Sequence, residues 1–396
     1  MSGHSRAPAG GPATPPGLPA PGPKERERSA RLAARLRDLM AEAGGAVPFH
    51  RYMAEALHAP GLGYYASGPA LGEGGDFVTA PELSPLFGRC LARTVAAALE
   101  QAGGGVVLEA GAGSGALASV LLRELEALGA LPEAYLILEL SPALRARQEA
   151  TLARELPALA QKVRWLQAPP ERLRGVVVAN ELLDALPCHR FLLDGEGAWE
   201  LGVAWEGGRF AWARLPLEDP DLAERVRALE GGLPRPYASE VGLAAEAWVR
   251  TLGEALERGL MLLVDYGFPR HEYYHPQRAE GTLMCHYRHR AHPDPLVLVG
   301  LQDLTAHVDF TALAEAGAEA GLEVAGFTPQ GPFLADAGLG ELLAGAPEPE
   351  RLGLAQAAKR LALPHEMGEL FKVLALRRGP GGPLPGFRLL DHRHRL

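Results

Sequence analysis

The residues best placed to do chemistry are three glycines in a short turn, Gly111, Gly113 and Gly115. They follow an apolar run at residues 106–110 and precede residues 116–128, whose apolar positions have helical spacing. Glycine lets a ligand approach the backbone, and a helix N-terminus offers unpaired amide groups with a partial positive charge. The pattern therefore predicts a nucleotide-binding turn between a buried strand and a helix.

The glycines alone leave the ligand open, because Gly111, Gly113 and Ala116 also fit the dinucleotide pattern G-x-G-x-x-A. Glu109 precedes the first glycine by two residues, and Gly115 extends the run to E-x-G-x-G-x-G. This form resembles motif I of class I methyltransferases that use S-adenosylmethionine. The resemblance favours S-adenosylmethionine over NAD; a dehydrogenase and a tight turn that binds nothing are the alternatives.

Two further strand ends are candidates for cofactor contacts. In open α/β sheets the ligand lies beyond the carboxyl ends of the strands. Glu139 ends the strand expected at 134–140, where an acid can accept hydrogen bonds from ribose hydroxyls. Gln167 ends the strand expected at 163–167, where a side chain that contacts adenine is expected.

The strand expected at 175–179 ends in Asn-Glu-Leu-Leu-Asp-Ala-Leu-Pro, which places Asn180, Glu181 and Asp184 at the expected reaction centre. A methyl sulfonium is already reactive, so the enzyme must mainly position the nucleophile and exclude water. If the nucleophile is a guanidinium nitrogen, carboxylates can hold the other nitrogens. Glu181 and Asp184 share a face if the segment is helical; otherwise Asp184 is a turn or cap residue. Methyltransferases that act on adenine or glutamine have a Pro-Pro-aromatic run at this point, and Asn180 does not begin one. Amide and base nitrogens are therefore disfavoured as methyl acceptors.

Alternating strand and helix patterns predict an α/β fold of the class I methyltransferase type, with a Rossmann-like seven-stranded sheet. We expect a Pro/Gly-rich disordered leader at 1–28, an N-terminal helical cap with a cofactor-covering loop at 29–100, a methyltransferase core at 101–378 and a tail at 379–396. Ser29 is the expected cap of the first helix. The core carries two insertions, at about 190–258, beginning with a β-meander, and at 267–308, a long substrate-side loop.

The amino-acid composition limits which binding partners and which cellular compartment we expect for this protein. The net charge of −9 and the lack of a long Lys/Arg run argue against nucleic acid, and no run of about 18 apolar residues predicts a membrane span. Three widely separated cysteines indicate a reducing, cytoplasmic setting. No metal site is expected, since His286, His289 and His292 lie on a Pro-containing loop without a cysteine pair.

Several longer motifs together resemble the MidA-like methyltransferases, bacterial relatives of the mitochondrial NADH:ubiquinone oxidoreductase complex assembly factor 7. They are the glycine turn, the segment 180–187, His-Ala-Pro-Gly-Leu-Gly-Tyr-Tyr at 58–65, Gly-Asp-Phe-Val-Thr-Ala-Pro-Glu at 75–82, Val-Asp-Tyr-Gly at 264–267 and Gln-Asp-Leu-Thr-Ala-His-Val-Asp-Phe at 302–310.

This resemblance covers roughly residues 46–378 and implies methylation of an arginine in a protein, symmetric and on a complex I subunit in the mitochondrial member. It places Thr79 and Glu82 near the cofactor, and His307 on a substrate loop as a base, a recognition residue or a structural residue. A homodimer and a noncatalytic assembly factor that binds S-adenosylmethionine remain open alternatives.

Overall fold

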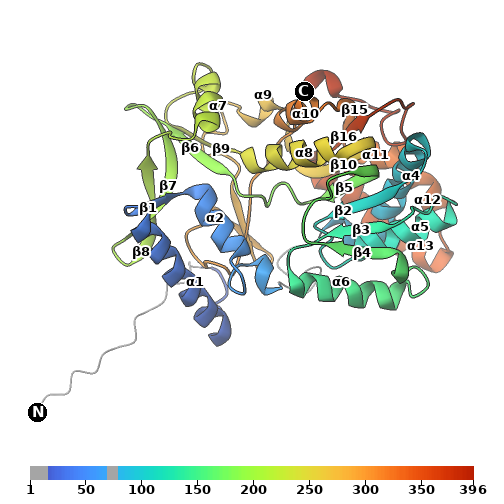
Figure 1. The fold of residues 1–396 in the computed structure, drawn as a ribbon, viewed down its shortest axis with the longest axis horizontal. Helices are drawn as coiled ribbons and strands as arrows, with labels where there is room; N and C mark the ends of the chain where they lie inside the picture. Colours follow the sequence, from blue (N-terminus) through green and yellow to red (C-terminus); the bar gives the residue numbers. More distant parts are fainter. Residues whose placement is uncertain (1–16, 69–78) are drawn as a thin grey trace, which may run out of the picture.

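A computed structural model describes residues 17–68 and 79–396 and has a large, mostly parallel sheet at its centre (Figure 1). Seven strands run in the order β15-β16-β10-β5-β2-β3-β4, and the short β14 (Val308–Asp309) pairs with the end of β10. The strands from β10 to β4 are parallel, whereas β16 is antiparallel to both of its neighbours. This topology confirms the predicted class I methyltransferase fold. The seven strands are β2 (Val106–Ala110), β3 (Tyr135–Leu138), β4 (Val163–Leu166), β5 (Leu173–Asn180), β10 (Leu256–Phe268), β15 (Glu323–Pro329) and β16 (Phe371–Arg378).

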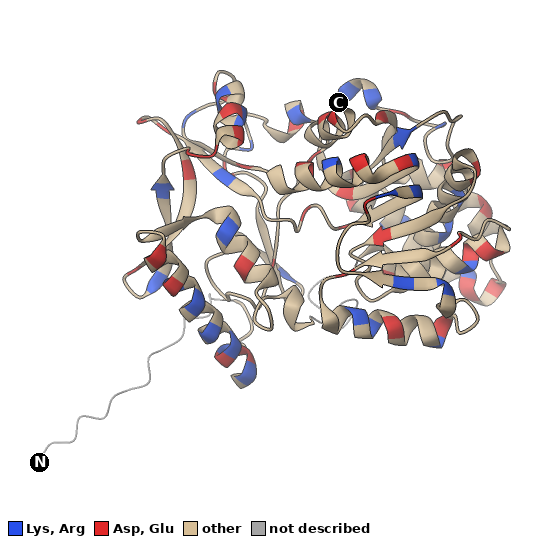
Figure 2. Ribbon diagram, in the orientation of Figure 1, with Lys and Arg blue, Asp and Glu red and all other residues tan. Residues whose placement is uncertain are grey.

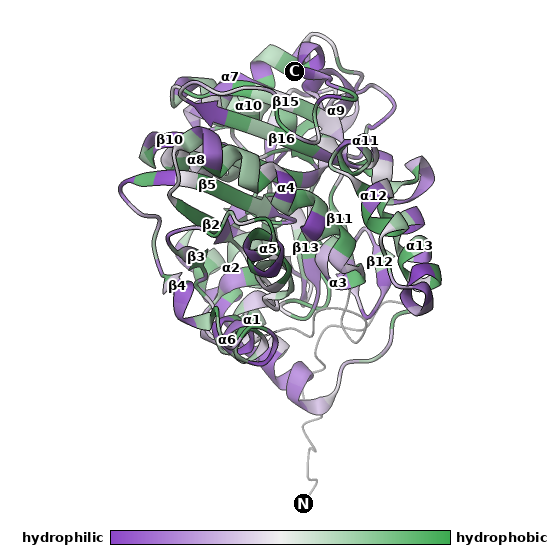
Figure 3. Cartoon of the chain, turned by 90° about the vertical axis from the view of Figure 1, so that its right-hand side faces the viewer, coloured by the Kyte–Doolittle hydropathy of each residue, from purple (hydrophilic) through white to green (hydrophobic). Residues whose placement is uncertain are grey.

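The central strands are buried on both faces, which explains why their sequences are continuously apolar. In β5, Val176 and Val178 join the core on one face, and Val177 and Ala179 join the core on the other. The apolar colouring of β2, β5, β10 and β16 shows the same property (Figure 3). The first face is covered by α4 (Pro85–Ala102) and α5 (Ala116–Ala127), and the second by α8 (Leu243–Ala255) and α10 (Phe310–Glu319).

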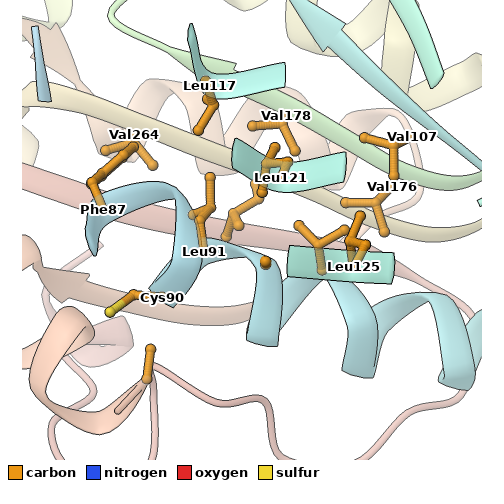
Figure 4. Packing of buried hydrophobic residues seen from close by; sticks show 14 of the residues in the cluster. Phe87, Cys90, Leu91, Val107, Leu117, Leu121, Leu125, Val176, Val178 and Val264 are labelled. Atoms are coloured by element: carbon orange, nitrogen blue, oxygen red, sulfur yellow. The ribbon is translucent and has the colours of Figure 1, made fainter. Parts of the chain in front are cut away.

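Helix α4 belongs to this core, although the sequence analysis assigned residues 29–100 to a cap. Ser84 caps its first turn by accepting a hydrogen bond from Leu86 N, and Gly103 ends it in a left-handed conformation. Phe87 and Leu91 of α4 point toward α5 and the strands (Figure 4). Fully burying each such side chain contributes about 1.5–3 kcal/mol. Outside α4 pack α11 (Gln330–Asp336), α12 (Leu339–Ala344) and α13 (Glu348–Ala362).

A second sheet stands apart from the central one and joins the N-terminal region to the first insertion (Figure 1). Its order is β1-β7-β6-β9, with β8 paired to β7, so the expected β-meander is present but is extended by strands from elsewhere in the chain. The strands are β1 (Ala46–Pro48), β6 (His189–Leu193), β7 (Ala198–Glu206), β8 (Arg209–Leu215) and β9 (Tyr237–Val241). Helices α1 (Pro23–Glu42) and α2 (Phe49–His58) share one apolar cluster with this sheet, and α7 (Pro220–Glu230) shares another. The predicted cap and the first insertion therefore form one structural unit.

Helix α1 begins at Pro23, which corrects the expectation that the ordered chain starts at Ser29. Pro at the first helical position and Glu25, whose carboxylate accepts from Gly22 N, start the helix earlier, and Ser29 lies buried inside it. Residues 1–16 of the predicted leader lie outside the described residues. At the other end, residues 379–396 pack on the core through the buried side chains of Leu384 and Phe387.

The segment expected to be a long loop at 267–308 instead contains regular structure. It holds α9 (Arg270–Tyr273) and a three-stranded sheet of order β12-β11-β13, formed by β11 (Met284–Tyr287), β12 (Arg290–His292) and β13 (Asp303–Thr305). These strands are only three or four residues long, which is why the sequence pattern did not reveal them.

The surface of the described chain mixes both signs of charge. Basic and acidic residues alternate along α1 and α6 (Pro142–Glu155) (Figure 2). Of the helices in the described ranges, none combines the length and apolarity needed to cross a bilayer.

Candidate active site

The three glycines form the predicted turn between β2 and the first residue of α5. All three have positive φ, at 70° for Gly111, 53° for Gly113 and 86° for Gly115. A Cβ on Gly111 would lie 2.8 Å from a methyl carbon of Leu182, and one on Gly115 would lie 3.2 Å from Cα of Gln148. At Gly111 and Gly115 a side chain is therefore disfavoured by both conformation and space, and glycine lets a ligand approach the backbone of the turn closely.

Glu139 follows β3 and is held next to this turn by Gln148 of α6. The Gln148 amide donates to Oε2 of Glu139 at 2.9 Å and to the Gly113 carbonyl at 3.1 Å. Its oxygen accepts from the indole nitrogen of Trp165 in β4 at 2.9 Å. One buried amide thus connects the glycine turn with the ends of two neighbouring strands and fixes the carboxylate that we expect to bind ribose.

Gln148 is a site residue that the sequence analysis missed. The buried positions of α6 are Leu144, Gln148 and Leu152, spaced by four residues. A polar residue on the buried stripe of an amphipathic helix was the available signal, since buried polar groups need hydrogen-bonding partners. Gln167, which the sequence favoured as an adenine contact, lies exposed just after β4, and its role stays a prediction.

Glu109 lies inside the sheet rather than at its open edge. Its side chain is 2% exposed, and its Oε2 accepts a hydrogen bond of 2.6 Å from the Tyr135 hydroxyl of β3. Burial raises the pKa of this carboxyl to about 7, although the bond from Tyr135 opposes the shift. The structure thus gives Glu109 a partner within the protein, and direct contact with a cofactor remains a prediction.

The short helix α3 (Ala80–Leu83) connects the glycine turn to the end of β5. Ser114 of the turn donates a hydrogen bond to the carboxylate of Glu82, and Ala80 N donates to Oε1 of Glu181 at 3.2 Å. Thr79 precedes this helix as its N-cap residue. Contact of Thr79 and Glu82 with the cofactor stays a prediction, and the preceding Gly-Asp-Phe at 75–77 lies outside the described residues.

The end of β5 adopts a strained conformation that points Glu181 into the site. Glu181 has a φ of 51°, which is uncommon for a residue other than glycine, and its amide donates to the Val264 carbonyl at 2.9 Å. The Asn180 side chain donates to Oε1 of Glu181 at 3.1 Å. Residues 181–184 form no helix, so Glu181 and Asp184 do not share a helical face. Glu181 and Asp184 nevertheless line one cavity, because the chain turns back between them.

Carboxylates are crowded here. Burial, and then the negative charge of Asp184, raise the pKa of Glu181 to about 8. Burial raises the pKa of Asp184 to about 6, although the Tyr266 hydroxyl donates a hydrogen bond to it. Behind them, Asp265 accepts hydrogen bonds from the backbone amides of Leu183 and Asp184. Burial, and then the negative charges of Asp184 and Glu181, raise the pKa of Asp265 well above its usual range. Among the described residues, no Lys or Arg forms an ion pair with Glu181, Asp184 or Asp265.

The second insertion supplies the opposite wall of the site. Asp303 of β13 is 3% exposed and accepts a hydrogen bond of 2.8 Å from the Tyr65 hydroxyl. His307 packs edge-on against the Tyr266 ring, with 5.2 Å between ring centroids. Burial, aided by the positive charges of Arg278 and Lys372, lowers the pKa of His307 to about 4. The ring is therefore neutral at pH 7 and a weak proton acceptor, which argues against the role of base and for recognition or structure.

These walls enclose a cavity of about 890 Å³ at the carboxyl ends of the central strands. Glu181, Asp184 and Asp303 provide acidic groups, and Tyr65 and Tyr266 provide aromatic rings. From the sequence, Asp303 was expected only to lie on the substrate-side loop, and Tyr65 and Tyr266 had no expected role of their own. The remaining lining includes Arg190, Leu192, Tyr237, Arg278, Glu280, Thr282, Met284, His286 and Phe371. The site thus combines a glycine turn suited to a nucleotide with an adjoining acidic cavity suited to a cation.

Comparisons with known proteins agree with this geometry. Residues 90–328 match the family described as "Putative S-adenosyl-L-methionine-dependent methyltransferase". The protein arginine methyltransferase NDUFAF7 homolog of Drosophila melanogaster is 31% identical over 371 residues, which are 85% of this chain and 82% of that relative. The mitochondrial NDUFAF7 of Homo sapiens is 28% identical, over 86% of this chain and 82% of its own.

A crystal structure from Burkholderia thailandensis, bound to S-adenosyl-homocysteine, is 49% identical and superimposes with a TM-score of 0.92. The match covers 96% of this chain and 100% of that one. A native structure from the same organism has a TM-score of 0.90 at the same identity and coverage. The chain belongs to the MidA-like family of S-adenosylmethionine-dependent methyltransferases.

Proposed function

We propose that this protein transfers a methyl group from S-adenosylmethionine to an arginine side chain of another protein. The observation that carries this proposal is the convergence of Glu181, Asp184 and Asp303 on one cavity beside the glycine turn. Besides burial, the negative charges of Asp184 and Asp303 contribute to the raised pKa of Glu181, which indicates repulsion among the three carboxylates, and a guanidinium placed among them would relieve it. Its planar fork of donors matches carboxylates better than an ammonium does.

The cofactor is proposed to lie over Gly111, Gly113 and Gly115, with Glu139 accepting hydrogen bonds from its ribose. Space left by the absent side chains and the fixed orientation of Glu139 support this placement. When bound, S-adenosylmethionine supplies an electrophilic methyl carbon on a sulfonium. Glu82, tied to Ser114 of the same turn, holds α3 over this side of the site.

Positioning is the main work of the acidic residues in this mechanism. Glu181 and Asp303 hold two guanidinium nitrogens, so that the third points at the methyl carbon. As the new N–C bond forms, the C–S bond breaks and its electron pair stays on sulfur. A guanidinium nitrogen that gains a methyl group must lose one proton, so as the N–C bond forms the attacking nitrogen gives its proton to the Glu181 carboxylate, which then releases it to solvent. Tyr65 and Tyr266 exclude water around the cation and offer their ring faces to it.

The relatives' names support a protein as the acceptor, because those proteins are called protein arginine methyltransferases. A respiratory complex I subunit, which the family resemblance implies, is the first candidate acceptor. Three free, buried cysteines support a reducing compartment such as the cytoplasm. A homodimer stays a prediction that light scattering would test.

The test is transfer of a labelled methyl group into a lysate from a deletion strain, followed by mass spectrometry of the acceptor. We expect labelled arginine with the wild-type protein, and at least a hundredfold less with Glu181→Gln. Labelling of another residue type would refute the arginine assignment. Binding of S-adenosylmethionine without any transfer would indicate a noncatalytic assembly factor, and binding of NAD in its place would indicate an oxidoreductase.

A further inference from the structure

Two histidines and a glutamate meet in the second sheet, away from the proposed site. His50 lies in the first turn of α2, His189 begins β6, and Glu200 lies in β7. Nδ1 of His189 is 2.8 Å from Oε1 of Glu200, and Nδ1 of His50 is 3.7 Å from the same oxygen. The three ligand atoms all lie within 4.8 Å of one another. The fold thus gathers three metal-type side chains from three separate elements.

Ordinary core packing leaves part of this cluster unexplained. Nδ1 of His50 is buried and has no hydrogen-bonding partner, which costs about 1–3 kcal/mol for a polar group. The two imidazole rings lie 3.9 Å apart between centroids, so protonation of both would place like charges in contact. Glu200 is 4% exposed, so its carboxylate also lies away from solvent. The cluster therefore presents a buried carboxylate and an imidazole nitrogen that lacks a hydrogen-bonding partner.

We propose that His50, His189 and Glu200 bind a divalent transition-metal ion of the Zn²⁺ type. Imidazole nitrogen and carboxylate oxygen are ligands that Zn²⁺ accepts, at about 2.0–2.2 Å. A tetrahedral ion with such bonds separates neighbouring ligand atoms by about 3.4 Å. The 3.7 Å pair is close to that separation, and the 2.8 Å pair must open slightly as the metal replaces the proton between them.

A water molecule would supply the fourth ligand; the His50 side chain is 31% exposed, although its Nδ1 is buried. The ion would tie α2 to β6, and β6 begins directly after Cys188, which follows the segment that carries Glu181. Arg190 and Leu192, also in β6, line the acceptor cavity. Metal binding therefore stabilises one wall of that cavity, and it requires no part of the proposed methyl transfer.

The test is a calorimetric titration of chelator-treated full-length protein with Zn²⁺ at pH 7.5. Two variants remove ligands, His50→Ala and Glu200→Gln, and His271→Ala, at an exposed histidine of α9, is the matched control. We expect one Zn²⁺ per wild-type and control chain, a higher melting temperature with Zn²⁺, and at least tenfold weaker binding in both ligand variants. Co²⁺ in place of Zn²⁺ should give the visible absorption of a four-coordinate site.

Absence of stoichiometric Zn²⁺ binding by the folded wild-type chain would overturn the proposal. So would wild-type affinity in either folded ligand variant. Circular dichroism of the metal-free proteins establishes folding. If the buried Glu200→Gln change prevents folding, the partly exposed His50→Ala variant decides alone.

Discussion

Replacing Glu181 with Gln should stabilise the free protein while removing its activity. Folding raises the pKa of this carboxyl from 4.5 to about 8. At about 1.4 kcal/mol per pH unit, that shift corresponds to a ceiling of about 5 kcal/mol of destabilisation. Water in the cavity and relaxation of the neighbours reduce the effect, so we expect a net gain of about 1–2 kcal/mol for the variant. The amide oxygen of Gln can still accept from Ala80 N and the Asn180 side chain.

The sign of the pH dependence follows from proton linkage. Because the folded-state pKa is the higher one, the folded chain holds the Glu181 proton between pH 4.5 and about 8, and that stability is lost as pH rises through this window. The gain in melting temperature for Glu181→Gln should therefore be small at pH 5 and largest at pH 9. Thermal melts of both proteins at pH 5, 7 and 9 provide the measurement.

Glu149→Gln is the matched control, since Glu149 is an exposed carboxylate on α6, and it should show no comparable gain at pH 9. An unchanged or lower melting temperature of Glu181→Gln at pH 9 would refute the reasoning about buried charge. Methyl transfer by the wild type should rise between pH 6 and 9, because ionised Glu181 holds the guanidinium and ionised Asp184 adds to the negative charge around it. A kcat/KM that falls across this range would contradict their role in acceptor binding.

Three further substitutions separate cofactor binding from acceptor binding. Gly115→Ala should lose about 1–2 kcal/mol of stability and bind S-adenosylmethionine more weakly, because residue 115 has a φ of 86° and the new Cβ would lie 3.2 Å from a backbone carbon. Thermal melts and calorimetry would check this prediction, and wild-type affinity for S-adenosylmethionine would contradict the proposal that the turn binds the cofactor. Gln148→Leu should cost about 2–3 kcal/mol and weaken cofactor binding, since Trp165 and Glu139 lose their partner, and an unaffected melting temperature would contradict that network. Asp303→Asn should raise KM for an arginine peptide at least tenfold and leave the Kd for S-adenosylmethionine unchanged; the reverse pattern would place Asp303 on the cofactor side.

Much of the central fold could be predicted because its signals are local. The glycines, the apolar strands and the amphipathic helices each show within a window of five to fifteen residues. The strands expected at 163–167 and 175–179 correspond to β4 and to part of β5. In contrast, β11, β12 and β13 were missed, because strands so short show too little periodicity.

The parallel sheet, the glycine turn and the carboxylates at the end of β5 could be predicted from the amino-acid sequence alone, since they depend on backbone conformation and hydrophobic period. Packing between distant segments placed Asp303 and Tyr65 in one cavity with Glu181, and placed Gln148 where it holds Glu139. It also decided that His50 meets residues 189 and 200. These contacts join residues separated by as many as 238 positions, and no local pattern encodes which surfaces pack together once each element has formed.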